Sequence, residues 1–257
     1  MTAPVQNPPV EHGVRIERAG PVATVTLCRP DVLNAQTPQM WARLRHIGSE
    51  LPGDVRVVVV RGEGRAFSAG IDLSVAQDEF AALGALEPAR AADRIAGYQA
   101  AFTWLRRPDL VSIAAVQGHA IGAGFQLALA CDLRVAAQDA RFTMAEVSLG
   151  LVPDLTGTRR LAELVGYARA LEICATGRRV AAADAQAMGL TNLVVPGSEL
   201  DAAVADLTAA LLAPPRDAVV EVKALLLGAL RRSPDEQELA EREAQVRRLR
   251  DLAGLGE

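Results

Sequence analysis

Hydrophobic and polar residues alternate over two short stretches near the start of the chain, residues 14–17 and 22–27. Ala19-Gly20-Pro21 separates these stretches, and turn residues between two alternating runs predict a β-hairpin. Two later stretches, 56–61 and 110–116, contain unbroken apolar runs. Such runs are typical of strands that are covered on both faces, so both should be buried strands.

Helical patterns fill most of the remaining chain. Thr37 followed by Pro38 is typical of a helix start, and the helix that it opens should run to about Leu51. Further short strands are expected at 132–136, 141–143 and 192–195, and further helices at 125–131, 158–165, 168–176 and 181–188. Three more helices are expected at 199–212, 216–230 and 234–252, with no strand between them.

Segment 75–107 is rich in Ala, Leu, Glu and Arg but also holds Gly84, Pro88 and Gly97. These breakers predict a set of broken helices, which are candidates for a mobile flap or a wall of a substrate site. The pattern changes once more at residue 196. We therefore divide the chain into a core, 1–196, whose first 12 residues should be a frayed tail, and a helical region, 197–257.

The most informative stretch is 117–132, QGHAIGAGFQLALACD, which follows the apolar strand directly. Gly118, Gly122 and Gly124 lie just before its second, helical half. A helix N-terminus carries free N–H groups and the positive end of the helix dipole, and glycines let a ligand approach the backbone. This arrangement predicts a site for a negatively charged group.

Composition excludes several classes of protein. The 257 residues are 50% hydrophobic, which is enough for one sizeable core, and the net charge of −4 makes nucleic acid an unsuitable partner. Neither a membrane span nor a signal peptide is expected. The chain has three widely spaced cysteines and three histidines without nearby ligand partners. These features predict a cytoplasmic protein with reduced thiols and no metal site.

Five collinear segments resemble the crotonase superfamily, the enoyl-CoA hydratase/isomerase family. They are CRPDVLNAQT (28–37), GRAFSAGIDL (64–73), GHAIGAGFQLALACDLRVA (118–136), AEVSLGLVPDLTGTRRL (145–161) and ATGRRVAAADAQAMGLTNLVVP (175–196). The resemblance covers roughly 14–196. It implies an α/β fold, a crotonase-like spiral of ββα units followed by a helical oligomerisation region. It also implies acyl-CoA substrates, homotrimers often paired into hexamers, and no cofactor besides the coenzyme A of the substrate.

The resemblance also assigns roles to single residues. The backbone N–H groups of Ile71 and Ala123 fall where the family holds the thioester oxygen as it gains enolate charge. Such preorganised donors contribute roughly 3–4 kcal/mol each to a transition state. Substrate-binding positions carried over in the same way are Leu33, Ala35, Ala69, Gly70, Asp72, Leu73 and Gly122, together with Arg29.

Acid–base chemistry is expected at Glu146, which matches one of two glutamates that hydratases of this family use. The second position is Gln126, and an amide cannot exchange a proton near neutral pH. Asp154 lies where some isomerases of the family carry an aspartate, although it could instead cap the next helix. Loss of one glutamate favours double-bond isomerisation over hydration.

Two alternatives stay open. Gln126 and Glu146 could together hold a water molecule, which would make the chain a hydratase. The chain could also be an acyl-CoA-binding protein without catalysis, because Asp31 and Ser74 stand where the family often has lysines near the nucleotide. Basic residues that could meet the phosphates instead are Arg29, Arg65, Arg247 and Arg248. A dinucleotide loop and a serine hydrolase site are both disfavoured, because their accompanying residues are missing.

Overall fold

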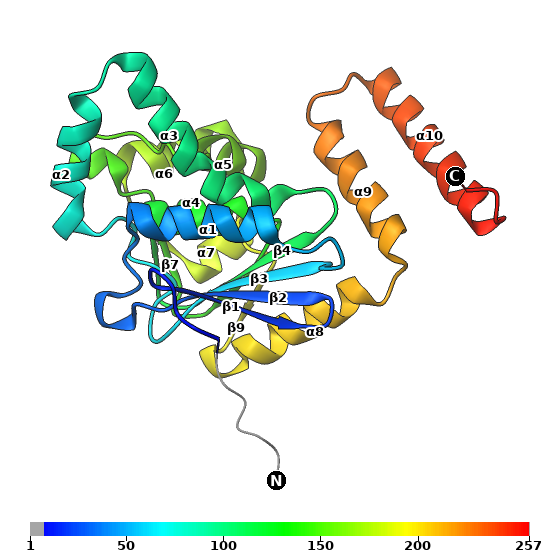
Figure 1. Ribbon diagram of the computed structural model, residues 1–257, viewed down its shortest axis with the longest axis horizontal. Coiled ribbons are helices and arrows are strands. Elements are labelled where there is room, and N and C mark those ends of the chain that lie inside the picture. Colours follow the sequence, from blue (N-terminus) through cyan, green and yellow to red (C-terminus); the bar gives the residue numbers. More distant parts are fainter. Residues whose placement is uncertain (1–7, 257) are drawn as a thin grey trace, which may run out of the picture.

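The computed structural model describes residues 8–256 (Figure 1). Its larger sheet has six strands in the order β1-β2-β3-β4-β6-β9. β1 and β2 form the predicted antiparallel hairpin, and the other neighbours in the sheet run parallel. The strands are β1 (Val14–Ala19), β2 (Val22–Leu27), β3 (Val57–Gly62), β4 (Val111–Val116), β6 (Leu133–Ala137) and β9 (Leu193–Val195).

A second, smaller sheet has the order β5-β7-β8. It consists of β5 (His119–Ile121), β7 (Arg141–Thr143) and β8 (Val180–Ala181). The helices are α1 (Pro38–Glu50), α2 (Leu73–Gly84), α3 (Pro88–Thr103), α4 (Ala123–Ala130), α5 (Gly157–Val165), α6 (Tyr167–Thr176), α7 (Ala182–Ala187), α8 (Leu200–Leu212), α9 (Arg216–Ala229) and α10 (Pro234–Leu252). Short 3-10 turns occur at Pro30–Val32, Trp104–Arg106, Glu146–Leu149 and Gly197–Glu199.

The four valines of β3 are buried on both faces of the large sheet, which explains the unbroken apolar run in this strand. Val58 and Val60 belong to the main core, which α1 and α4 cover. Val57 and Val59 face the other way, into a second core that α8 closes with Leu200. Figure 1 shows α1 and α8 on opposite sides of the large sheet. Because alternate side chains of a strand point to opposite faces, both sets had to be apolar.

Most predicted elements are present, with a few differences. The chain from 75 to 107 forms two helices that break between Gly84 and Pro88, but Gly97 lies inside α3 without breaking it. β5 and β8 were not predicted. Of the predicted frayed tail, residues 1–7 lie outside the described part of the chain, whereas Glu11 and Val14 exchange two backbone hydrogen bonds of 2.9 Å.

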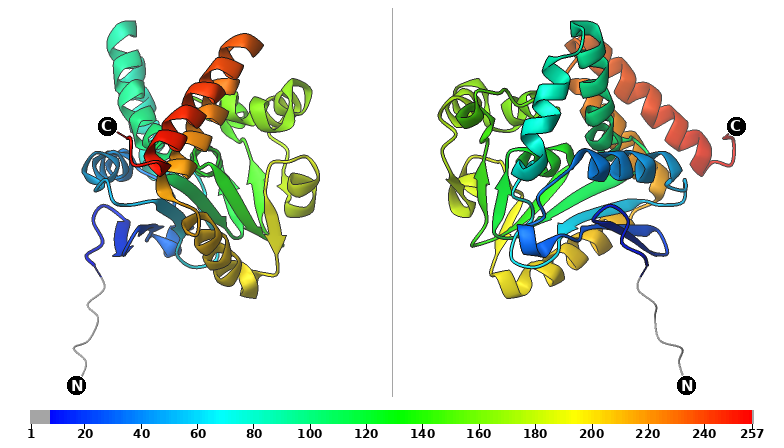
Figure 2. Two further views of the ribbon diagram at one scale, coloured as in Figure 1. Left: turned by 90° about the vertical axis from the view of Figure 1, so that its right-hand side faces the viewer. Right: turned by 60° about the vertical axis from the view of Figure 1, so that its left-hand side comes forward.

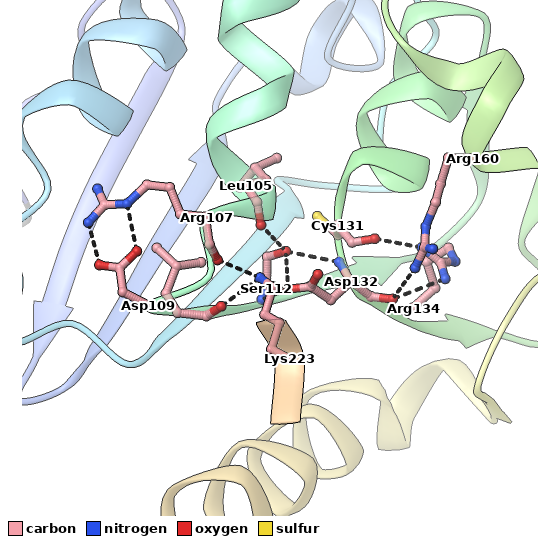
Figure 3. A network of polar contacts seen from close by, with 10 residues as sticks. Leu105, Arg107, Asp109, Ser112, Cys131, Asp132, Arg134, Arg160 and Lys223 are labelled. Atoms are coloured by element: carbon pink, nitrogen blue, oxygen red, sulfur yellow. Dashed lines mark hydrogen bonds and ion pairs between the residues drawn. The ribbon is translucent and has the colours of Figure 1, made fainter. Parts of the chain in front are cut away.

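The α2–α3 hairpin and the α9–α10 pair both rise from the side of the large sheet that α1 occupies (Figure 2). A buried network holds α9 to the core (Figure 3). Lys223, the chain's only lysine, is 8% exposed, and its ammonium donates 2.7 Å hydrogen bonds to Arg107 O, Leu110 O and Asp132 Oδ2. A compact ammonium with three donors matches three separate acceptors, which a planar guanidinium would not.

Lys223→Met is expected to lower the free energy of unfolding by roughly 3 kcal/mol, because it leaves the partly buried charge of Asp132 without its counter-ion. The double variant Lys223→Met, Asp132→Asn should recover part of this loss. Urea unfolding measures both, and Arg231→Met, at an exposed position beyond α9, is the control. A stability equal to that of the wild type would contradict an anchoring role for the pair.

Candidate active site

The two glycine-rich segments of the sequence lie against each other. Ser68 N–H donates to His119 O at 2.8 Å, and Ile121 N–H donates to Ser68 O at 3.0 Å. A Cβ atom at Gly70 would lie only 2.6 Å from Ile121 O. Any side chain at Gly70 would therefore push the segments apart, and its φ of +89° also favours glycine.

Each segment has a backbone amide at the cavity that donates no hydrogen bond to the described residues. Asp72 N–H donates to Gln36 O at 2.8 Å, and the preceding amide, Ile71 N–H, is left free. Ala123 is the first residue of α4, so its N–H has no intrahelical acceptor. Within residues 8–256 neither amide donates a hydrogen bond, and both residues line one cavity. The pair can hold an oxygen atom that gains negative charge, and the dipole of α4 adds to this effect.

Buried polar side chains fix the loop that carries Ile71. Trp41 Nε1 donates to Gln36 Oε1 at 2.7 Å, and Gln36 Nε2 donates to Ser68 Oγ at 3.0 Å. Ser68 Oγ in turn donates to Asn34 O at 2.8 Å. The sequence did not indicate these supporting residues, because a polar residue in a loop looks the same whether it is buried or solvated. The only signal was that Asn34, Gln36 and Ser68 lie within the two segments, 28–37 and 64–73, that resemble the family.

Gln126 is buried, with 1% of its surface exposed, and its amide orientation is set by its neighbours. Its Oε1 accepts from Leu155 N–H at 2.8 Å and from Gly157 N–H at 3.1 Å. Its Nε2 must then face the other way, where it donates to Glu146 Oε1 at 2.6 Å. Gln126 therefore orients the carboxylate of Glu146 and cannot itself take up a proton.

Glu146 lies beside the free amide of Ala123. A Cβ atom at Gly122, the residue before Ala123, would lie 3.4 Å from Glu146 Oε1. The second carboxylate oxygen, Oε2, is buried and has no hydrogen-bond partner among the described residues. Burial raises the pKa of Glu146 above its ordinary value of 4.5, and the charge of Asp154 adds to the rise, whereas the hydrogen bond from Gln126 opposes it. A carboxylate with one free, desolvated oxygen suits a general base.

Asp154 lines the same cavity as Glu146. The interpretation of Asp154 as a helix cap is wrong, because α5 has Thr156 as its N-cap and the first amide of the helix, Gly157 N–H, donates to the side chain of Gln126. The amide of Leu155, just before the helix, also donates to Gln126, so Gln126 rather than Asp154 holds the start of α5. Burial raises the pKa of Asp154, so the cavity holds two carboxyl groups that are both harder to ionise than in water.

The cavity has a volume of about 490 Å³. The predicted substrate-binding residues Ala69, Gly70, Leu73 and Gly122 line it, whereas Leu33, Ala35, Asp72 and Arg29 do not. Its apolar wall comes mainly from α1, α2, α3 and the segment after Glu146, through Trp41, Phe80, Leu83, Ile95, Leu149, Leu151 and Val152. Segment 75–107 thus forms a wall of the site, as predicted.

Arg29 supports the loop rather than the cavity. Its Nη1 donates to Ala35 O at 2.7 Å, and its Nη2 lies 2.8 Å from Asp72 Oδ2. These two contacts tie Arg29, Ala35 and Asp72 to one another outside the cavity wall. Arg247 and Arg248, also expected near phosphates, pair with Glu221 and Asp251 within the helical region. Arg65 is exposed.

Over residues 8–256, no helix combines the length and the apolar character that crossing a membrane requires. The same residues contain no group of three or more His, Cys, Asp or Glu side chains placed to hold a metal ion.

A family model described as enoyl-CoA hydratase/isomerase matches residues 17–251. The chain belongs to the enoyl-CoA hydratase/isomerase family. The short-chain-enoyl-CoA hydratase of Clostridium acetobutylicum is 36% identical to this family member over 195 residues, which are 74% of this chain and 71% of that protein.

Solved structures agree with this assignment. A candidate enoyl-CoA hydratase from Thermobifida fusca, in complex with CoA, has a TM-score of 0.89 and 49% identity, covering 97% of this chain and 99% of its own. A second structure from Thermobifida fusca, in complex with acetoacetyl-CoA, has a TM-score of 0.89 and 47% identity, covering 96% and 100%. The crotonase-like α/β fold predicted for this enoyl-CoA hydratase/isomerase family member is thereby confirmed.

Proposed function

We propose that this family member is an enzyme that moves a double bond within the acyl chain of an acyl-CoA thioester. One observation carries the proposal: the amide of Gln126 is held as a donor to Glu146 by three hydrogen bonds. Of Gln126, Glu146 and Asp154, only the two carboxyl groups can therefore exchange protons near neutral pH. A hydration mechanism that uses two glutamates would lack its second acid–base group here, because Gln126 stands at that position.

The proposed reaction starts from a 3-enoyl thioester. Glu146 Oε2 removes a proton from C2, and the electron pair of that C–H bond moves towards the thioester oxygen, which the N–H groups of Ile71 and Ala123 hold. The C3–C4 double bond then shifts to C2–C3, and C4 takes up a proton. That proton comes from Glu146 itself or through Asp154. No atom is gained or lost, so a single shuttling carboxylate is sufficient.

Paired thioesters of equal chain length test this function. A 3-enoyl-CoA should be converted to the conjugated 2-enoyl-CoA, seen as rising absorbance of the conjugated thioester. A 2-enoyl-CoA should lose that absorbance much more slowly. Faster loss from the 2-enoyl substrate would contradict isomerisation as the main reaction. Binding of thioesters by calorimetry without any turnover would instead make the chain an acyl-CoA-binding protein.

Hydration is the second candidate, and one observation favours it. Gln126 Nε2 uses only one of its two N–H groups, on Glu146, and Glu146 Oε2 has no partner among the described residues. A donor and an acceptor side by side in the cavity can hold a water molecule. The water would be activated by Glu146 alone.

Gln126→Glu is expected to raise hydration of a 2-enoyl-CoA at least about tenfold, because it supplies the second acid–base group. The new carboxyl would lie against Glu146 at the distance where the two oxygens must share a proton. Loss of conjugated-thioester absorbance measures the gain. The exposed Gln138→Glu is the matched control. An unchanged hydration rate in a folded variant would show that the amide at 126 does not limit this reaction.

We also propose a quaternary structure and a cellular compartment for this family member. A homotrimer, or a pair of trimers, is supported by exposed apolar residues on both helices of the α9–α10 pair, which are Val222, Leu226, Leu239, Val246, Leu249 and Leu252. A reducing, cytoplasmic setting is supported by Cys28, Cys131 and Cys174, which are all free thiols.

A further inference from the structure

The acyl wall of the cavity contains a polar cluster that the proposed proton transfer does not use. Glu79 on α2 and Tyr98 on α3 both line the cavity, among mainly apolar neighbours. Tyr98 O–H donates to Glu79 Oε1, and Arg94, one turn before Tyr98, donates from Nε to Tyr98 Oη at 2.8 Å. Arg94 Nη2 also lies 2.8 Å from each carboxylate oxygen of Glu79.

The charge of this cluster is balanced. The side chain of Glu79 is only 12% exposed, so its ionised form needs a partner, and Arg94 provides one from the outer side of the hairpin. Because the cluster carries no net charge, neither a cationic nor an acidic group on the substrate would gain a net electrostatic attraction here. The cluster suits a neutral polar group.

Glu79 still has room for one more donor. A carboxylate has about four acceptor positions. Oε1 accepts from Tyr98 and forms an ion pair with Arg94, whereas Oε2 accepts only from Arg94 among residues 8–256. Tyr98 Oη is already both a donor and an acceptor. The open position on Glu79 is therefore an acceptor. Neutral donors that can fill it are hydroxyl and amide N–H groups, and of these the hydroxyl is the one that a simple acyl chain carries.

The wall that carries this cluster is tied to the reaction centre. The rings of Tyr98 and Trp41 pack with their centroids 4.9 Å apart, and Trp41 belongs to the chain of hydrogen bonds that fixes the Ile71 loop. Gln99, next to Tyr98, donates to Asp154 O at 2.7 Å. The polar cluster is thus held at a set place relative to the groups that would hold the thioester.

We propose that Glu79, supported by Tyr98 and Arg94, selects acyl-CoA substrates that carry a hydroxyl group on the acyl chain away from the thioester. This inference deepens the proposed function and rests on its premise that the cavity takes an acyl-CoA. A cluster that only joined α2 to α3 would not discriminate between acyl groups.

The test measures binding rather than turnover. Saturated straight-chain acyl-CoA thioesters from butyryl to decanoyl, each paired with its ω-hydroxy counterpart, are titrated into the full-length protein by calorimetry. Saturated chains can be neither isomerised nor hydrated. At one chain length the hydroxylated partner should bind at least about tenfold more tightly. Glu79→Gln and Tyr98→Phe should reduce this preference, because they weaken binding of the hydroxylated partner several-fold more than binding of the unsubstituted thioester.

Asp78→Asn is the matched control, because Asp78 is exposed on the same helix and does not line the cavity. Equal binding of both partners at every length would overturn the inference, as would Glu79→Gln weakening both partners equally. A hydroxyl preference without turnover of any enoyl thioester would leave this inference standing and overturn the proposed reaction. Failure of every thioester to bind would overturn both.

Discussion

Glu146→Gln is expected to lower kcat for 3-enoyl-CoA isomerisation by about 10³-fold. The change keeps the size of the side chain and the hydrogen bond from Gln126, but it removes the carboxylate beside the Ala123 amide. Positioned general bases contribute about 10² to 10⁴ in rate, and the desolvated Oε2 of Glu146 places it in the upper half of that range. Because thioester binding relies on other groups, KM should change little.

The matched control for Glu146→Gln is Glu238→Gln, a change of the same size on the exposed face of α10. Steady-state kinetics of the wild type and both variants on one 3-enoyl-CoA decide the matter. Turnover by Glu146→Gln within about threefold of the wild type would remove Glu146 from the mechanism. Asp154 would then be the remaining candidate for the base.

The same variant should change how stability depends on pH. Because burial raises the pKa of Glu146 in the folded state above 4.5, the folded chain binds this proton more tightly than the unfolded chain does. Stability therefore falls as pH rises from the unfolded value to the raised folded value, and stays lower above it. Glu146→Gln should gain stability relative to the wild type at neutral pH but not at pH 4. Thermal unfolding at both pH values measures the difference, and equal differences at the two values would contradict the raised pKa.

Ala123→Pro is expected to lower kcat by about 10² to 10³-fold, because it removes one of the two amides that hold the developing oxyanion. Proline is tolerated at the first position of a helix, where the N–H has no intrahelical partner. α4 should therefore still form. The preceding Gly122, with a φ of +50°, avoids the restriction that a residue with a side chain meets before proline.

Tyr167→Pro is the matched control, since Tyr167 is the exposed first residue of α6. Both variants should show wild-type circular dichroism, and only Ala123→Pro should lose activity. Binding of a saturated acyl-CoA should weaken much less than kcat falls, because the donor acts mainly on the charged state. Full activity in a folded Ala123→Pro variant would exclude the Ala123 amide as an oxyanion donor.

Local signals predicted most of the fold. The Thr37-Pro38 pair does begin α1, and the Thr37 hydroxyl accepts from Met40 N–H at 3.3 Å. β5 and β8 escaped prediction, because β5 lies inside the glycine-rich stretch and β8 has only two residues, directly before a helix, so neither shows a strand period of its own. Gly97 did not break α3, since α3 packs along α1 and tertiary contacts outweigh a propensity cost of about 1 kcal/mol.

In the candidate site, too, local sequence signals predicted some residues and tertiary contacts decided others. The glycine spacing and the family motifs were sufficient to name Ile71, Ala123 and Glu146, because each lies within a short, recognisable segment. The sequence left two roles open for Gln126. It could be a buried hydrogen-bonding residue without a chemical role, or a residue that positions a reacting group. Its three partners come from segments 20 to 31 residues further along the chain. Only the folded structure could show which way its amide faces.

By itself, the sequence determined the family and the order of most strands and helices, and it named the two loops whose amides we propose face the substrate. These features depend on residues that are close together in the chain, where hydrophobic period and glycine position act directly on the backbone. The tertiary structure alone decided that Gln126 is a donor to Glu146, that Asp154 is not a helix cap, and that Glu79, Tyr98 and Arg94 meet in the acyl wall. Hydrogen bonds and burial between distant segments set the direction and the pKa of these groups, and no local pattern encodes which segments will meet.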